Sequence, residues 1–202
     1  MGSDSTLIVC EYTATIRDAM RARGIDAWWN DILKTEGDPR WHLQMDCRDA
    51  IRSREWALII MCLPCTAMAV CGNRHYASTA ARTEAIEWSL GTWHLATAVC
   101  DRVALENPAS VIFPHLRKAG AVVQYIQPWQ FGHLEQKKTG LALHGLPRLE
   151  PTYDVYDAMM TLPKAERERV FHMPPSDRRG LERSRFYDGV AGAMADQWGA
   201  LP

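Results

Sequence analysis

Residues 56–66, WALIIMCLPCT, contain the most apolar run of the chain and end in a turn that carries a cysteine. The run from Trp56 to Cys62 has no charged residue, as expected of a central parallel strand that is buried on both faces. Because Pro64 cannot donate to a strand ladder, Cys65 should lie on a turn just past the strand. We therefore place the centre of a sheet at residues 56–62, with Cys65 at the carboxyl end of its strand.

Three shorter apolar runs precede this strand. Residues 6–10, 25–29 and 42–46 read TLIVC, IDAWW and HLQMD, and we expect each to form a strand. Residues 16–23 have helical spacing, and Gly24 should stop that helix. Each of these strands ends on, or is closely followed by, an acidic residue. These residues are Glu11, Asp31 and Asp46.

A long helical pattern follows, from residue 78 to residue 105, and leads into Glu106-Asn107-Pro108. We place this tripeptide at another strand end, because Pro108 forbids simple continuation as ladder or helix. Residues 121–127 and 139–143 predict two more strands, paired at the far edge of the sheet. A final helical pattern spans residues 187–198.

Strands alternate with helical segments over the first two thirds of the chain. This order predicts an α/β fold with a doubly wound, mostly parallel, Rossmann-like sheet. Ligands of such sheets lie beyond the carboxyl ends of the strands, so the side chains that follow the strands should converge on one cleft. We expect a single domain over residues 1–202, with a short irregular C-terminal region. Within it, residues 150–180 are expected to form a minimal recognition region or a flexible loop.

Charge and composition restrict the function only loosely. Lys and Arg number 23 and Asp and Glu number 24, which gives a net charge of −1 at pH 7. No global positive field would attract phosphates, so nucleic acid is neither indicated nor excluded. No stretch approaches the roughly 20 apolar residues of a membrane span. We expect a soluble, cytoplasmic protein with no membrane partner, whose six cysteines are reduced.

A zinc site is one interpretation of the cysteines, since Cys62 and Cys65 are three residues apart and Cys71 and His75 follow. Structural zinc usually draws paired ligands around a turn. Here Cys62 ends an apolar strand and should point away from the side of the turn that Cys65 occupies. We therefore expect no metal site.

Pro64-Cys65 and Glu106-Asn107-Pro108 together resemble the signature of the cytosine carbon-5 DNA methyltransferases. That family has Pro-Cys after its fourth strand and Glu-Asn-Val after its fifth. The chain looks most similar to small phage-type members, which carry stretches like QPWQFGH at residues 127–133 and QWG at 197–199. The resemblance implies a DNA (cytosine-5-)-methyltransferase with a Rossmann-like core that uses S-adenosylmethionine.

The resemblance assigns the reacting groups. Cys65 would add to carbon 6 of cytosine, and Glu106 would contact ring nitrogen 3 and the exocyclic amine. Neighbours of these two residues and a local concentration of positive charge would bind the substrate and its phosphates. The neighbours are Thr66, Asn107 and Pro108, and the basic residues are Lys137, Arg183 and Arg185, with Lys138, Arg178 and Arg179 nearby. A solvated, salt-bridged surface is the alternative for the basic residues.

For the cofactor, Asp31 is the natural partner of ribose hydroxyls, and Asp46 would approach the adenine amine. Pro64 is expected beside the cofactor, as are Glu11, Tyr12 and Thr13 in the first strand-to-helix turn. The family usually has Phe-x-Gly-x-Gly in that turn, whereas this chain has no glycine between Cys10 and Arg23. The two aspartates are equally consistent with solvated loop carboxylates.

Two alternative functions stay open at this point. The same chemistry could act on a free cytosine nucleotide or use a different one-carbon donor, because no separate recognition domain is evident. The chain could also be a catalytically silent, nucleic-acid-binding homologue, since the glycine-free turn departs from the family. The sequence leaves the oligomeric state open.

Overall fold

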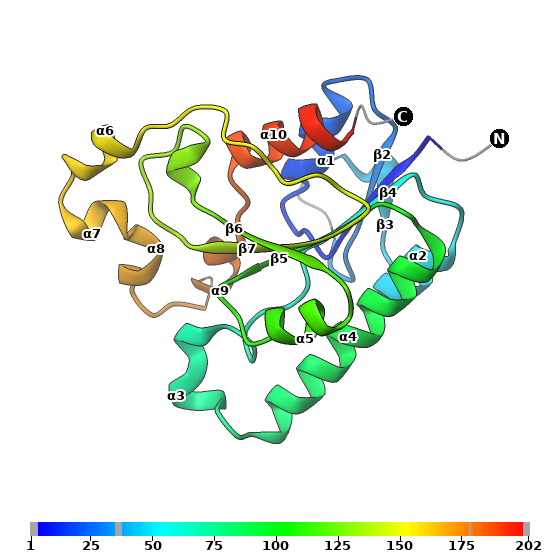
Figure 1. Cartoon of the computed structure of the whole chain (residues 1–202), viewed down its shortest axis with the longest axis horizontal. Helices are drawn as coiled ribbons and strands as arrows, with labels where there is room; N and C mark the ends of the chain where they lie inside the picture. Colours follow the sequence, from blue (N-terminus) through cyan, green and yellow to red (C-terminus); the bar gives the residue numbers. More distant parts are fainter. Residues whose placement is uncertain (1–3, 35–37, 178, 200–202) are drawn as a thin grey trace.

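The computed structural model describes residues 4–34, 38–177 and 179–199. Its centre is a seven-stranded sheet with the order β3-β2-β1-β4-β5-β7-β6 (Figure 1). Strands β1 to β5 are parallel, and β7 runs antiparallel to both β5 and β6. The strands are β1 (Thr6–Val9), β2 (Ala27–Asn30), β3 (His42–Leu43), β4 (Leu58–Met61), β5 (Val103–Pro108), β6 (Val122–Ile126) and β7 (Thr139–His144). This topology confirms the predicted α/β, mostly parallel sheet.

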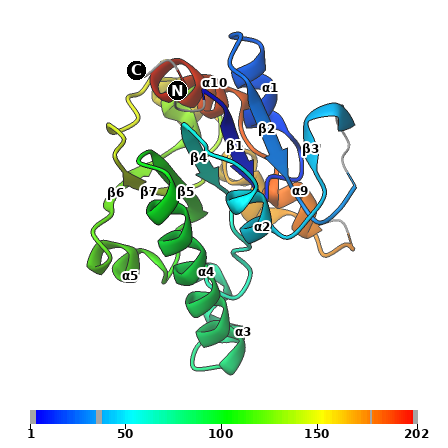
Figure 2. The same ribbon diagram turned by 90° about the vertical axis from the view of Figure 1, so that its right-hand side faces the viewer.

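Helices cover both faces of the sheet, which makes it doubly wound (Figure 2). One face is covered by α1 (Thr15–Arg21) and α10 (Asp188–Trp198), which pack against each other. The other is covered by α2 (Cys47–Arg52), α4 (Ala80–Val99) and α5 (Phe113–Lys118). The remaining helices are η1 (Pro39–Trp41), η2 (Val70–Gly72), α3 (Asn73–Tyr76), η3 (Pro128–Gln130), α6 (Tyr156–Met160), α7 (Lys164–Arg167), α8 (Arg169–His172) and α9 (Arg179–Ser184).

The central strands are buried on both faces, as their unbroken apolar sequence predicts. In β4, Ile59 and Met61 join the core under α2, α4 and α5, whereas Ile60 joins the core under α1 and α10. All three side chains have no exposed surface. Complete burial of such a side chain stabilises the fold by about 1.5–3 kcal/mol.

Two predicted boundaries were wrong. The third strand has only two residues, because Asp46 caps α2 instead: its carboxylate accepts the Arg48 N–H at 2.8 Å. The long helix ends at Val99, well before residue 105, and β5 begins at Val103. Both runs are apolar, so hydrophobic spacing alone did not separate helix from strand.

Strand β5 also continues further than Pro108 led us to expect. Its parallel pairing with β4 ends where Leu105 faces Met61, but its antiparallel pairing with β7 runs on to Pro108. Pro108 is the last residue of the strand, where a missing N–H disrupts no later rung. Glu106 therefore lies one residue beyond the parallel ladder, and its strand partner is Leu141 of β7.

Residues 150–177 form short helices that are attached to the sheet through η3. The N–H groups of Thr152 and Tyr153 both donate to the Gln130 carbonyl at 3.1 Å. Val155 N–H donates to the Trp129 carbonyl at 2.9 Å.

In the described part of the chain, no helix has the length and apolar character that a membrane crossing requires.

Candidate active site

Cys65 lies on a tight turn beyond β4. Its carbonyl accepts the N–H groups of Met68 and Ala69 at 2.9 and 2.8 Å, which turns the chain back toward β5. Cys65 itself is half-buried, while Pro64 and Thr66 on either side are exposed. Burial raises the pKa of the Cys65 thiol, and the charge of Glu106 raises it further. The thiol is therefore protonated at rest and needs a nearby change of charge to become a nucleophile.

Glu106 lines a narrow, partly open cavity of about 20 Å³ together with Lys137 and Arg185. That volume holds about one water molecule. Burial raises the pKa of Glu106, and the ammonium group of Lys137 opposes this rise. The same ammonium lowers the pKa of Cys65, so the thiol, the carboxyl group and the ammonium form one electrostatic unit.

Asn107 joins the two strand ends. Its side chain has no exposed surface, and its Nδ2 donates to the Leu63 carbonyl at 3.1 Å. This bond fixes the turn that carries Cys65 relative to the strand that carries Glu106. The described geometry thus gives Asn107 a positioning role, and the half-buried Pro108 follows it at the end of β5.

Lys137 and Arg183 meet above this site. Lys137 Nζ donates to the Arg183 carbonyl at 3.1 Å and lies 5.5 Å from the centroid of the Tyr187 ring. Arg183 Nη2 lies 3.7 Å from Cys71 Sγ. Arg185 is exposed and pairs with Glu182 at 3.0 Å. The basic residues therefore gather at the predicted site, and Lys137 faces its interior; Arg178 lies outside the described residues.

Residues 184–187 line the cavity at Glu106, and we call them the covering segment. Sequence reasoning missed the contacts that hold this segment. The Tyr187 hydroxyl donates to Glu135 Oε2 at 2.9 Å, and Arg169 Nη2 donates to Glu135 Oε1 at 2.8 Å. Burial raises the pKa of Tyr187 above its usual value, so its hydroxyl stays a donor. Glu135 thus ties the two segments on either side of α9 to the loop before β7. No local sequence pattern marks such a contact between residues that are 52 positions apart.

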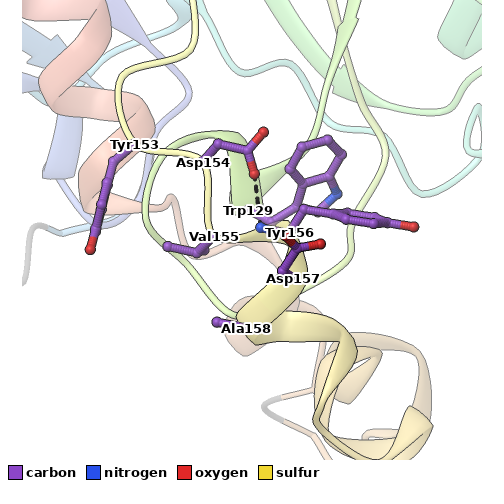
Figure 3. Close-up of a pocket in the computed structure, with 7 residues that line it drawn as sticks. All are labelled: Trp129, Tyr153, Asp154, Val155, Tyr156, Asp157 and Ala158. Carbon is purple, nitrogen blue, oxygen red and sulfur yellow. Dashed lines mark hydrogen bonds between the residues drawn. The ribbon is translucent and has the colours of Figure 1, made fainter.

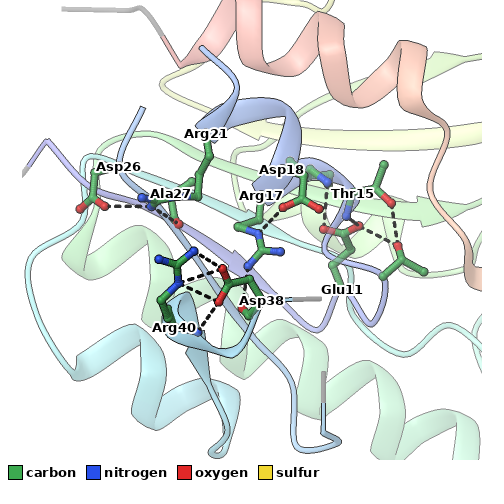
Figure 4. A network of polar contacts seen from close by, with 11 residues as sticks. Glu11, Thr15, Arg17, Asp18, Arg21, Asp26, Ala27, Asp38 and Arg40 are labelled. Atoms are coloured by element: carbon green, nitrogen blue, oxygen red, sulfur yellow. Dashed lines mark hydrogen bonds and ion pairs between the residues drawn. The ribbon is translucent and has the colours of Figure 1, made fainter. Parts of the chain in front are cut away.

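The turn after β1 is closed by its own carboxylate (Figure 4). Glu11 accepts the N–H groups of Thr15 and Ile16 at 2.6 and 3.1 Å, and the Thr13 hydroxyl at 2.9 Å. Burial raises the pKa of Glu11 to about 7, against the opposing effect of these donors. Tyr12, between Glu11 and Thr13, is half-buried. The first backbone N–H groups of α1 are thus satisfied within the chain.

The same turn adopts a backbone shape that usually requires glycine. Cys10 and Ala14 both have φ of 58°, in the left-handed region. A residue with a Cβ holds such a conformation at a cost of about 1–3 kcal/mol. The lack of glycine in the sequence therefore does not by itself change the path of this turn.

Cys10, at the end of β1, lies within the influence of Asp31 and of Cys47. The Cys10 N–H donates to the Asn30 carbonyl at 2.8 Å, and the charge of Asp31 raises the pKa of the Cys10 thiol. A hydrogen bond between Cys10 and Cys47, the residue after Asp46, raises that pKa more strongly. The ends of β1 and β2 and the start of α2 therefore lie side by side around Cys10.

The residues next to Asp31 fit an adenosine group. Asp31 Oδ1 accepts the Leu33 N–H at 2.9 Å, which leaves the second oxygen to accept from a ribose hydroxyl. Ile32 and Leu33 are 70% and 53% exposed, so an apolar surface adjoins the carboxylate. A purine ring would bury part of that surface.

Arg17 is a second residue whose importance the sequence does not reveal. Its side chain is 1% exposed, and its Nη1 donates to the Asp38 carbonyl at 3.1 Å (Figure 4). Its guanidinium lies 5.1 and 5.8 Å from the centroids of Trp29 and Trp41. Arg17 therefore fastens the segment before β3 to α1. Elsewhere in the described ranges, as around the cysteines, no three potential metal ligands cluster.

Comparisons with known proteins show the fold. No protein-family model matches the sequence, and neither does any curated protein. Among solved structures, a methyltransferase of Entamoeba histolytica has a TM-score of 0.53 at 13% identity, with 74% of this chain and 57% of that chain covered. A protein assigned as a DNA modification methyltransferase, encoded within an Escherichia coli prophage, has a TM-score of 0.51 at 14% identity, with 80% and 56% covered.

A Dnmt2 methyltransferase of S. pombe has a TM-score of 0.48 at 15% identity, with 81% of this chain and 56% of that chain covered. The chain thus spans a little more than half the length of the structures it matches. With its strand order and its antiparallel β7, it has the Rossmann-like fold of the two methyltransferases whose TM-scores exceed 0.5.

Proposed function

We propose that the chain transfers a methyl group from S-adenosylmethionine to carbon 5 of cytosine in DNA, with Cys65 as the nucleophile and Glu106 as its partner. The observation that carries this proposal is their meeting at the ends of adjacent parallel strands, tied by the bond from Asn107 to Leu63 at 3.1 Å. The fold shared with two methyltransferases supports it.

The charges of the site suit this chemistry. A protonated Glu106, favoured by its raised pKa, donates a hydrogen bond to ring nitrogen 3 and draws electrons from the ring. Burial still raises the pKa of Cys65 when Glu106 is neutral, but the charge of Glu106 no longer adds to that rise, and Lys137 opposes it, so formation of the thiolate becomes easier. The thiolate then adds to carbon 6, which makes carbon 5 nucleophilic. Carbon 5 then forms a bond to the methyl group, and S-adenosylhomocysteine leaves with the electrons of the broken sulfur–methyl bond. The carbon-5 proton passes through a base to solvent, and elimination of the thiolate re-forms the ring double bond and restores Cys65.

The cofactor would lie between the turn after β1 and the end of β2. Asp31 would hold ribose hydroxyls, Ile32 and Leu33 would cover the purine, and Asp46 would lie near the adenine amine while it caps α2. Glu11, Tyr12, Thr13 and Pro64 would border the rest of the site. S-adenosylmethionine supplies an electrophilic methyl group when it is bound.

Entry of a base requires the covering segment to move. The cavity at Glu106 holds about one water, whereas a pyrimidine ring is several times larger. Ser184, Arg185 and Phe186 form one wall of this cavity. We therefore expect residues 184–187 to shift when a flipped cytosine enters, as base extraction from a duplex requires. Thr66, Pro108, Lys137, Arg183 and Arg185 would then border the nucleotide.

A free cytosine nucleotide is the second candidate substrate. The observation that favours it is the charge of residues 150–177, the stretch in which we expect a recognition region. This stretch has six carboxylates and three Lys or Arg side chains, which opposes broad contact with a phosphate backbone.

A trapping assay tests the proposal. The whole chain is incubated with S-adenosylmethionine and an oligonucleotide that contains 5-fluorocytosine, whose fluorine cannot be lost as a proton. We expect a covalent adduct on Cys65, found by denaturing gel and peptide mass. The Cys65→Ser variant should form none, whereas Cys71→Ser, which alters an exposed cysteine nearby, should still form it.

Each other outcome has a defined meaning. An adduct with fluorinated cytidine nucleotide but not with DNA would transfer the proposal to the second candidate. An adduct that persists in Cys65→Ser would refute the assigned nucleophile. If neither probe is trapped and calorimetry detects no binding of S-adenosylmethionine, the chain is a catalytically silent homologue.

A further inference from the structure

A separate open hollow of about 640 Å³ lies where α6 meets η3 (Figure 3). Its lining comes from two stretches of chain, Trp129 on one side and residues 153–158 on the other. Three aromatic rings and two carboxylates dominate this lining, which we call the aromatic hollow. None of its residues lines the cavity at Glu106.

The aromatic hollow has a fixed frame. Gly132 N–H donates to the Tyr153 carbonyl at 2.8 Å, and Val155 N–H donates to the Trp129 carbonyl at 2.9 Å. The rings of Trp129 and Tyr156 meet edge to face, with centroids 5.0 Å apart. Two separate backbone bonds and a ring contact therefore hold the two sides together without a ligand.

The exposed rings of the hollow lie beside negative charge. Tyr153 and Tyr156 are 69% and 44% exposed. Asp154 Oδ1 accepts the Tyr156 N–H at 2.8 Å, which leaves its second oxygen for another donor. Asp157 lines the same hollow and is also exposed (Figure 3). An aromatic face attracts cations, and two carboxylates add to that attraction.

We propose that the aromatic hollow binds an arginine side chain of a partner polypeptide. A guanidinium group stacks on Trp or Tyr and pairs with a carboxylate through parallel hydrogen bonds, and this lining offers both partners. The hollow is open at Tyr153 and Tyr156, so it would enclose a free small molecule poorly, whereas a polypeptide can lie across it. The two carboxylates would repel the phosphates of a nucleic acid.

Fluorescence anisotropy of a labelled Gly-Arg-Gly-Arg-Gly peptide, titrated with the whole chain, tests this inference. Neither cofactor nor DNA is present, so the result does not depend on the proposed methyl transfer. We expect saturable binding that weakens as salt rises. The same peptide with citrulline in place of arginine, which keeps the shape and loses the charge, should bind at least about threefold more weakly.

Variants locate the binding. Asp157→Asn removes one carboxylate, and Tyr156→Leu removes one ring while keeping apolar volume. Each should weaken binding by at least about threefold. Asp49→Asn is the matched control, because Asp49 is an exposed carboxylate on α2, across the sheet, and its loss should leave affinity unchanged.

Four results would overturn the inference. They are no binding to the wild-type chain, equal binding of the citrulline peptide, equal weakening by the Asp49 control, and free spermidine or arginine amide binding as tightly as the peptide. The last would assign the hollow to small organic cations. A labelled single-stranded oligonucleotide that loses affinity in Tyr156→Leu would instead assign it to nucleic acid.

Discussion

Substitution of Glu11 by Gln should change how the stability of the chain depends on pH. Burial raises the pKa of Glu11 from 4.5 to about 7, so the folded state holds the proton more tightly than the unfolded state. The resulting stabilisation is fully present below about pH 4.5 and is lost as the pH rises through about 7. A shift of this size corresponds to about 3 kcal/mol, of which about 2.5 kcal/mol is lost between about pH 5 and pH 8.

Glutamine has nearly the same shape but cannot ionise. Its amide keeps one acceptor for the N–H groups of Thr15 and Ile16 and loses the other, at a cost of about 1 kcal/mol at every pH. The advantage of wild type over Glu11→Gln should therefore fall by about 2.5 kcal/mol from about pH 5 to pH 8.

Urea unfolding of both proteins at several pH values measures this difference. Glu87→Gln, at an exposed position on α4, is the control and should follow the wild-type curve. A difference that stays constant with pH, or grows as the pH rises, would refute the argument that burial controls the charge of Glu11.

Three further substitutions test other contacts. Lys137→Met removes the charge that lowers the pKa of Cys65, so alkylation of Cys65 by iodoacetamide at about pH 8 should slow; an unchanged rate by peptide mass would contradict the coupling. Asn107→Ala leaves a buried carbonyl unpaired and should lower the free energy of unfolding by about 1–3 kcal/mol, with faster alkylation of Cys65 as its turn loosens. Gly140→Ala would place a Cβ against the ring of Phe113 and should lower the free energy of unfolding by about 1–3 kcal/mol, and with it the midpoint of thermal unfolding; an unaltered melting curve would disprove this.

Much of the fold could be predicted because its strands are short apolar runs bounded by clear breaks. The run at residues 56–62 became β4, and the helix before Gly24 ended as expected, with Gly24 at φ of 78°. The helix α2 was missed because Asp46 was interpreted only as a ligand of the cofactor. Its capping of α2 follows the same short-range pattern that marks helix starts in general.

The candidate site was predictable only in part. Pro64-Cys65 and Glu106 stand in short motifs, so a resemblance identified them. The burial of Arg17 depends on Trp29 and Asp38, which are 12 and 21 positions away, and no local spacing indicates such contacts. The left-handed backbone at Cys10 was likewise hidden, because sequence rules reserve that conformation mainly for glycine.

The pairing of β5 has a consequence for the order in which the chain folds. Beyond Leu105, the backbone ladder of β5 continues with β7, where Glu106 faces Leu141, while the Asn107 side chain bonds to the Leu63 carbonyl. During synthesis, β4 and the Cys65 turn that follows it can pair with β1 long before residues 139–144 leave the ribosome. The backbone of Glu106 gains its ladder partner when that late strand inserts between β5 and β6. A nascent or truncated chain that ends before β7 would therefore hold Glu106 beside the cysteine without the ladder of the finished sheet.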